Sequence, residues 1–256
     1  MAPMDSMAVA RVQDFIDAGG AALLLLEAMQ LNAQQPTATP FRSGLESLIR
    51  DRGVALTGSM VLDLQSSERV SLGQRGLFNV IAPYPLWPIA IAGSDHAITS
   101  GLNAVTFAWA TSLDILDTTR VASLWQTTAA GATQSPMLPI MPDQDWALPP
   151  EELGPRTIAV AVTPAEGETD GRLVVVGDVT FAEGQFMQGN PANLIFLANS
   201  IDWLAQDEAL IRIRSKDRTP PTFLFSSDLT QSTMKWSNLL GVPLLFVLIG
   251  ALRVTG

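Results

Sequence analysis

The chain has 256 residues, of which 47% are hydrophobic and 16% are charged, and this composition is typical of an ordered protein with a membrane context. Its formal net charge of -10 repels phosphate backbones and therefore argues against nucleic acid as a partner. Cysteine is absent and His96 is the single histidine, which excludes thiol catalysis and disulfides and disfavours His-rich metal sites and Ser-His-Asp catalysis. We therefore expect no metal and no cofactor.

The first part of the chain alternates between helical and extended patterns. The predicted elements are, in order, a helix from about Ser6 to Ile16 capped by Ser6 and ended by Asp17 to Gly20, a buried strand at Ala21–Leu26, a helix around Leu45–Ile49 and a short strand at Met60–Asp63. This order predicts parallel pairing with right-handed crossovers. A helix that leads into a parallel strand normally has a strand before it. We therefore expect the chain to be a C-terminal piece of a longer protein.

The middle of the chain gives weaker signals. The predictions are a loop at residues 65–76, at best an edge strand in the proline-broken run Tyr84–Ile89, a strand at Val121–Gln126 and no assigned structure for residues 127–155. Thr157–Val162 alternates weakly, and a strong turn signal follows it at residues 166–171. This pattern predicts an antiparallel hairpin with Leu173–Val176.

The best-marked stretch is the apolar run Leu173–Val176. Such runs are typical of a strand buried on both faces, as in parallel sheets. Gly177 and Asp178 end the strand, and a helix is predicted to begin with Asn190 as its cap and Pro191 in its first position. We therefore predict an α/β fold, a mostly parallel sheet with helices on both faces. The predicted central strands are Leu23–Leu26, Met60–Asp63 and Leu173–Val176.

Three residues are candidate binding residues. Asp178 follows a central strand at its carboxyl end, where open α/β sheets place ligand crevices, although an aspartate there also caps turns. His96 lies in a Ser-Asp-His loop and is a candidate base, but a loop histidine without a nucleophile motif is more often a hydrogen-bonding residue. Asp63 ends a strand and has the same two interpretations as Asp178. No Gly-x-Ser-x-Gly, Walker or dinucleotide-binding motif is present, so we expect no catalytic residue and no enzyme activity.

A long uncharged run lies near the end of the chain, from Trp236 to Leu252. Its length is close to the lower limit for a membrane-spanning helix, and Trp236 is placed like an interfacial anchor. The alternative interpretation of this run is a buried core helix. Pro243 favours the membrane helix, because proline weakens a soluble helix more than a membrane helix. The predicted organisation is an α/β domain at residues 1–214, a linker at residues 215–235 and a transmembrane helix at residues 236–253.

Several of these stretches, taken in order, resemble a known family. They are Gly19-Gly20 before a leucine strand, the loop Asp95–Leu102, Val174–Phe181, Gly189-Asn190, Asn199–Ala205 and Ile211–Arg214. Together with the terminal uncharged run they resemble the GldG-type auxiliary component of bacterial ABC transport systems, named for gliding motility, over nearly the whole chain. The resemblance implies an extracytoplasmic α/β domain of the flavodoxin-like and glutamine-amidotransferase-like fold group. It also implies an ABC permease and an ATPase as partners.

The resemblance further implies a non-catalytic, membrane-anchored subunit of the bacterial inner membrane, with the domain on the periplasmic side. Relative to the family, the upstream span and first strand are missing and the basic cluster after the last span is reduced to Arg253, so we expect both ends to be truncated. Local charge indicates the opposite side, because Lys216, Arg218 and Lys235 precede the uncharged run and only Arg253 follows it. A basic tail such as the family has would reverse that count.

The alternative function is a divergent hydrolase of the amidotransferase-like fold that uses Asp178 and His96. This alternative requires both side chains in one pocket, near a common substrate. The resemblance also disfavours it, because the enzymatic relatives of this fold use a cysteine nucleophile and the chain has no cysteine.

Overall fold

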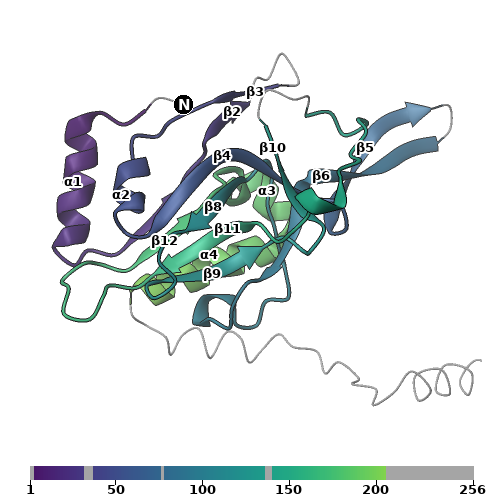
Figure 1. Ribbon diagram of the computed structural model, residues 1–256. Helices are drawn as coiled ribbons and strands as arrows, with labels where there is room; N and C mark the ends of the chain where they lie inside the picture. The colour runs from purple at the N-terminus through teal and green to yellow at the C-terminus, as the bar shows by residue number, and fades with distance from the viewer. Residues whose placement is uncertain (1–2, 32–36, 76–77, 136–139, 206–256) are drawn as a thin grey trace, which may run out of the picture. The chain divides into compact units, whose positions relative to one another are not determined.

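The computed structural model describes residues 3–31, 37–75, 78–135 and 140–205 (Figure 1). The predicted linker at residues 215–235 and the uncharged run Trp236–Leu252 lie outside the described residues. Among the helices of the described part, none is both long and apolar enough to cross a membrane.

Most strands belong to one seven-stranded sheet with the order β1-β12-β11-β9-β6-β5, in which β7 also pairs with β6. Its strands are β1 (Ala22–Leu25), β5 (Ser67–Arg75), β6 (Phe78–Ala92), β7 (Val105–Thr106), β9 (Val121–Gln126), β11 (Thr157–Val162) and β12 (Leu173–Val176). Strands β1 and β12 run parallel, with Leu23 opposite Val174. The other described pairs in this sheet are antiparallel.

Two smaller antiparallel sheets complete the strands of the described residues. They are the three-stranded sheet of β10 (Gly131–Gln134), β4 (Val54–Asp63) and β8 (Thr111–Ile115), and the two-stranded sheet of β2 (Met29–Leu31) and β3 (Ala38–Pro40). The helices are α1 (Ser6–Asp17), α2 (Glu46–Arg50), α3 (Gly184–Gly189) and α4 (Pro191–Leu204), with short 3₁₀ helices η1 (Ala97–Thr99), η2 (Pro150–Glu152) and η3 (Thr180–Ala182).

The core explains why the run Leu173–Val176 is apolar throughout. Val174 and Val176 point to one face of β12 and pack in a cluster with Phe196 of α4. Figure 1 accordingly shows α4 running across the back of β9 and β11. Leu173 and Val175 point to the other face and pack in a second cluster, which includes side chains of α1, α2, β4 and β8. The strand is therefore buried on both faces, as predicted.

The predicted mostly parallel, flavodoxin-like fold is wrong. The structure is a mixed, largely antiparallel and β-rich fold, and β4, which includes the predicted central strand Met60–Asp63, lies in a separate sheet from β1 and β12. A strand buried on both faces is typical of parallel sheets because helices cover both faces there. Here α4 covers one face, whereas two short helices and the three-stranded sheet cover the other. Two-sided burial therefore does not require parallel neighbours.

Several local predictions are confirmed. The helix predicted from Pro191 is α4, and the predicted hairpin pairs β11 with β12, with Ala161 opposite Val174. The strand Val121–Gln126 is β9, and α1 ends at Asp17, where the Asp17 to Gly20 segment was predicted to end it, with Gly19 at φ +92°.

Other local predictions are wrong. Asp5, not Ser6, caps α1, because the Asp5 carboxylate accepts a hydrogen bond from the Ala8 N–H at 2.7 Å. Asn190 is at the predicted N-cap position of α4, but its side chain forms no capping bond and its amide instead donates to the Phe186 carbonyl at 3.1 Å. The predicted loop at residues 65–76 contains β5, and residues 127–155 contain β10.

The run Tyr84–Ile89 is not an edge strand but part of the long strand β6, which lies between β9 and β5. Pro88 lies opposite Ser67 and Pro83 lies opposite Arg69, so both prolines flank a register irregularity in the pairing with β5, and irregular positions are where sheets usually place proline. Ile91 and Ala92 pair with β9, whereas the preceding part of β6 pairs with β5 through two register irregularities.

Candidate functional site

The two parallel strands end at the same edge of the sheet, and an acidic residue follows each of them. Glu27 lies two residues after β1, and Asp178 lies two residues after β12. The Asp178 side chain is buried, with 1% of its surface exposed. Burial, together with the charge of Glu27, raises the pKa of Asp178 to about 7, although backbone hydrogen bonds oppose the shift. Burial also raises the pKa of Glu27.

Asp178 ties two segments of backbone together. One carboxylate oxygen accepts a hydrogen bond at 3.1 Å from the N–H of Phe181, which lies in η3. The other accepts from the Ala108 N–H at 2.7 Å, in the segment between β7 and β8. The turn-capping interpretation of Asp178 thus describes its contacts, and the bond to Ala108 adds a link to a neighbouring strand connection.

The residue after Ala108 has an unusual backbone conformation. Trp109 has φ +54°, in the left-handed region that large side chains rarely adopt. The backbone N–H of Trp109 donates to the Leu86 carbonyl at 2.9 Å, and its indole N–H donates to the Tyr84 hydroxyl at 2.9 Å. Strained conformations persist where the surrounding structure determines them, and they are frequent at functional sites. The position of the Trp109 ring is therefore determined by several contacts at once.

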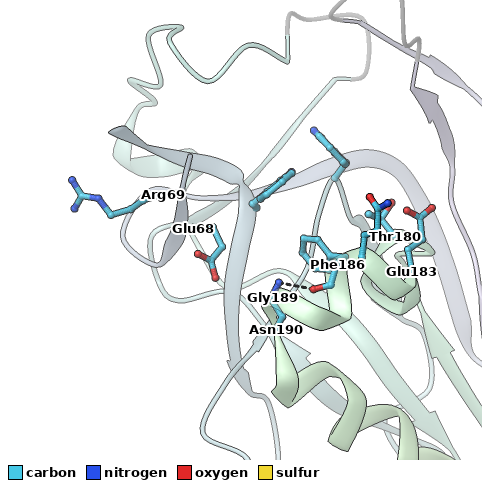
Figure 2. A pocket seen from close by; sticks show the side chains of 10 residues that line it. Glu68, Arg69, Thr180, Glu183, Phe186, Gly189 and Asn190 are labelled. Atoms are coloured by element: carbon cyan, nitrogen blue, oxygen red, sulfur yellow. Dashed lines mark hydrogen bonds between the residues drawn. The ribbon is translucent and has the colours of Figure 1, made fainter. Parts of the chain in front are cut away.

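Trp109 lines a cavity of about 560 Å³ next to the edge at which β1 and β12 end. Figure 2 shows the side chains that line this cavity. This volume is within the range of about 300–1,000 Å³ that is usual for small-molecule sites. The lining residues come from β5, β6, the β7–β8 connection, η3, α3 and the residues immediately before α3 and α4: Glu68, Arg69, Trp87, Trp109, Thr180, Glu183, Gln185, Phe186, Gly189 and Asn190.

Among the aromatic rings of the lining, Trp87 stands nearly perpendicular to both Trp109 and Phe186. The ring centroids of Trp87 and Trp109 are 5.1 Å apart with an interplanar angle of 87°. The ring centroids of Trp87 and Phe186 are 5.5 Å apart with an angle of 88°. Such edge-to-face contacts are favourable for aromatic pairs. As a result, the aromatic walls of the cavity meet at corners and are not stacked in parallel.

The charged groups of the lining are mostly acidic. Glu68 is half-buried and accepts a hydrogen bond from the Thr106 hydroxyl at 3.2 Å. Glu183 is exposed at the start of α3. Figure 2 shows that Arg69 extends away from the other labelled residues, as expected for the strand neighbour of Glu68. Within the described residues, neither glutamate forms an ion pair.

The structure does not place His96 at this cavity. The His96 ring packs against the Trp203 ring at 5.2 Å, near the C-terminal end of α4, and its Nδ1 accepts from the Ile98 N–H at 3.2 Å. Asp178 lies near the other end of this helix, because its partner Phe181 is bonded through its carbonyl to Asn193. Ten residues of helix separate Asn193 from Trp203, about 15 Å. Asp178 and His96 therefore do not share a pocket.

Asp63 is also held by structural hydrogen bonds. Its side chain is fully buried, and its carboxylate accepts bonds from the N–H groups of Gln65 and Ser66, both at 2.9 Å. It also accepts from the backbone N–H of Thr128 at 2.6 Å and from the Thr128 hydroxyl at 2.9 Å. These bonds join the end of β4 to the turn before β10. Neither Asp63 nor His96 lines the cavity.

No group of histidine, cysteine and carboxylate side chains in the described residues is arranged to hold a metal ion. The sequence pattern pointed through Asp178 to the edge of the sheet beside this cavity, but it did not predict the cavity walls. Trp87 lay in a run predicted as an edge strand, and Glu68 lay in a predicted loop. The available signal was the abundance of tryptophan, since the chain has 6 tryptophans and a single tyrosine.

Comparisons with known proteins support a family assignment. Residues 2–212 match the model of an auxiliary-component family described as "ABC-type uncharacterized transport system". No significant match was found among curated proteins. A solved structure described as "mmIFT52 N-terminal domain" is similar with a TM-score of 0.47 and 14% identity, covering 79% of this chain and 72% of that chain, a likeness too low to support a functional conclusion. Because the family match covers most of its length, the chain belongs to this family of ABC-type transport system components.

Proposed function

We propose that this chain is a non-catalytic, membrane-anchored auxiliary subunit of a bacterial ABC-type transport system, of the GldG type. The family match supports the transport role, and the ordered stretches from Gly19-Gly20 to Ile211–Arg214 support the subtype. The uncharged run Trp236–Leu252 supports anchoring in the inner membrane. The resemblance supports placing the domain on the periplasmic side, with an ABC permease and an ATPase as partners.

The observation that carries this proposal, beyond the family match, is the cavity between Trp87, Trp109 and Phe186. A cavity with aromatic walls and a few convergent polar groups is the usual form of a binding site. The ionisable groups that sequence analysis assigned to a hydrolase, Asp178 and His96, lie near different ends of α4. The geometry therefore favours binding of a partner or cargo over hydrolysis by this pair.

Affinity purification tests the proposal. The full-length chain with a C-terminal tag is expressed in its own bacterium, extracted from membranes with detergent and purified. Co-purification of a permease and an ATPase in comparable amounts is the expected result. A chain that stays in the soluble fraction contradicts the anchoring, and a chain that elutes from membranes alone contradicts the partnership.

The side of the membrane is tested separately with protease added to intact spheroplasts. Digestion of the domain before lysis is the expected result, because the domain is proposed to face the periplasm. Protection until the spheroplasts are lysed contradicts the periplasmic placement and indicates the orientation that the local charge count favours.

A further inference from the structure

We propose that the cavity is an aromatic cage for an organic cation, namely an alkylammonium group. This inference rests on the cavity being the binding site of the proposed function and names the chemical class that the site takes. The same cation group occurs on free small molecules and on lysine side chains of proteins, so the experiment below distinguishes these two sources.

The first support is the arrangement of the rings. A cation is attracted to the face of an aromatic ring when it lies within about 6 Å of the ring centroid, and tryptophan is the best such partner. Trp87 stands at 87° to Trp109 and at 88° to Phe186, with centroid separations of 5.1 and 5.5 Å. A small cationic group beside this corner reaches more than one ring at the same time. A flat ligand would instead favour parallel walls.

The second support is the sign of the charges. Glu68 on β5 and Glu183 immediately before α3 contribute carboxylates from separate parts of the chain, and Arg69 extends away (Figure 2). Glu27 lies close enough to Glu183 and Asp178 for their charges to interact. The field at this edge of the sheet is therefore negative, and the whole chain has a formal net charge of -10. A cation is the complementary ligand.

The third support is pre-organisation. The Trp109 backbone is held in the left-handed region by the bond from its N–H to Leu86, and its ring is held by the bond to the Tyr84 hydroxyl. The neighbouring Ala108 N–H is bonded to Asp178. A wall fixed in this way loses little conformational freedom when a ligand binds, and this improves affinity.

Isothermal titration of the full-length chain in detergent with three probes tests the proposal. Choline represents a free organic cation, N-acetyl-lysine amide represents a protein side chain, and 3,3-dimethyl-1-butanol is the neutral isostere of choline. Binding of at least one cation with saturation below about 10 mM, and much weaker binding of the neutral isostere, are expected. Tighter binding of choline points to a free small molecule, and tighter binding of the lysine amide points to a protein segment.

Conservative variants locate the binding. Glu68→Gln and Glu183→Gln keep the size of each side chain and remove one negative charge, and each should weaken cation binding by about five-fold. Phe186→Leu removes one ring and should weaken it to a similar extent. The matched controls are Glu166→Gln, at an exposed turn, and Phe15→Leu, on the exposed face of α1. Both controls should bind as the parent chain does.

Three results overturn the cage. They are no saturable binding of either cation, equal binding of the neutral isostere, and cation binding that the three cavity variants leave unchanged. These titrations use the chain without its transporter, so failure of the cage is separable from failure of the proposed function, which the co-purification tests.

Discussion

The carboxylate of Asp178 accepts a hydrogen bond from the backbone N–H of Ala108 at 2.7 Å, although the two residues are 70 positions apart in the chain. Ala108 immediately precedes Trp109, a wall of the cavity with a left-handed backbone. A buried ionisable group thus supports the segment that shapes the candidate site. Asp178 is a positioning residue, since it acts on the cavity through Ala108 rather than by lining it.

Asp178→Asn should reduce the pH dependence of stability between pH 5 and 8. The pKa of Asp178 in the folded chain is about 7, above its ordinary 3.8, so the folded state holds a proton that the unfolded state releases in this window. This contribution is fully present below about pH 3.8 and is lost as the pH rises through 7. The parent domain should therefore gain roughly 2–3 kcal/mol from this group between pH 8 and pH 5.

Chemical unfolding at several pH values measures that slope. The exposed substitution Asp143→Asn is the matched control and should keep the slope of the parent chain. Equal slopes for Asp178→Asn and the parent chain would show that Asp178 does not titrate in this range.

Tyr84→Phe should destabilise the domain by about 1–3 kcal/mol. The Tyr84 hydroxyl donates to the Ile140 carbonyl and accepts from the indole N–H of Trp109. Removal of the hydroxyl breaks both hydrogen bonds, and the Trp109 ring loses the bond that its indole N–H forms. Urea unfolding measures the loss, and the titration with choline measures its effect on the cavity. An unfolding midpoint equal to that of the parent chain would contradict the role given to this hydroxyl.

Val175→Asp should unfold the domain. Val175 is 0% exposed in the centre of β12, and an unpaired buried carboxylate costs several kcal/mol against a total stability of about 5–15 kcal/mol. Leu116→Asp is the control, because the Leu116 side chain is 54% exposed. Circular dichroism and thermal melting distinguish the two. A cooperative melt for Val175→Asp at the temperature of the control would contradict the burial of this strand face.

Gly177→Ala should destabilise the domain by about 1–3 kcal/mol through overpacking. A Cβ atom at Gly177 would lie 2.1 Å from the Thr111 carbonyl oxygen, which belongs to the backbone of β8 and has little freedom to move. Gly154→Ala is the matched control, since a Cβ there meets no atom within 4 Å. Thermal melting of both variants provides the comparison, and equal melting temperatures would argue against the close approach of β12 and β8.

The sequence predicted local structure better than topology. Leu173–Val176 was predicted as a strand buried on both faces, and its hairpin with Thr157–Val162 was predicted to be antiparallel. Both predictions were possible because apolar runs and turn residues are local signals. The sheet in which β4 lies was not predictable in this way. Its partners β8 and β10 are distant in sequence, and the periodicity of a strand does not specify which strand lies beside it.

The candidate site was predictable only in part. Asp178 marked the carboxyl end of β12, and this edge does adjoin the cavity through Thr180 and Glu183. The aromatic walls come from separate elements that long-range pairing brings together. The orientation of Trp109 in particular depends on its positive φ, which its local sequence does not predict. Glycine and asparagine are the usual residues in that left-handed conformation.

Site-specific photo-crosslinking in cells tests most directly whether the cavity is the binding site of a transport subunit. A photoreactive phenylalanine analogue replaces Phe186 in the cavity or Phe15 on the exposed face of α1, and crosslinked partners are identified by mass spectrometry. We expect the analogue at position 186 to crosslink to the ABC permease or its cargo, and choline in excess to suppress that crosslink. The analogue at position 15 should give no such product. Absence of any product from position 186, or equal products from both positions, would contradict the assignment of the cavity as the binding site.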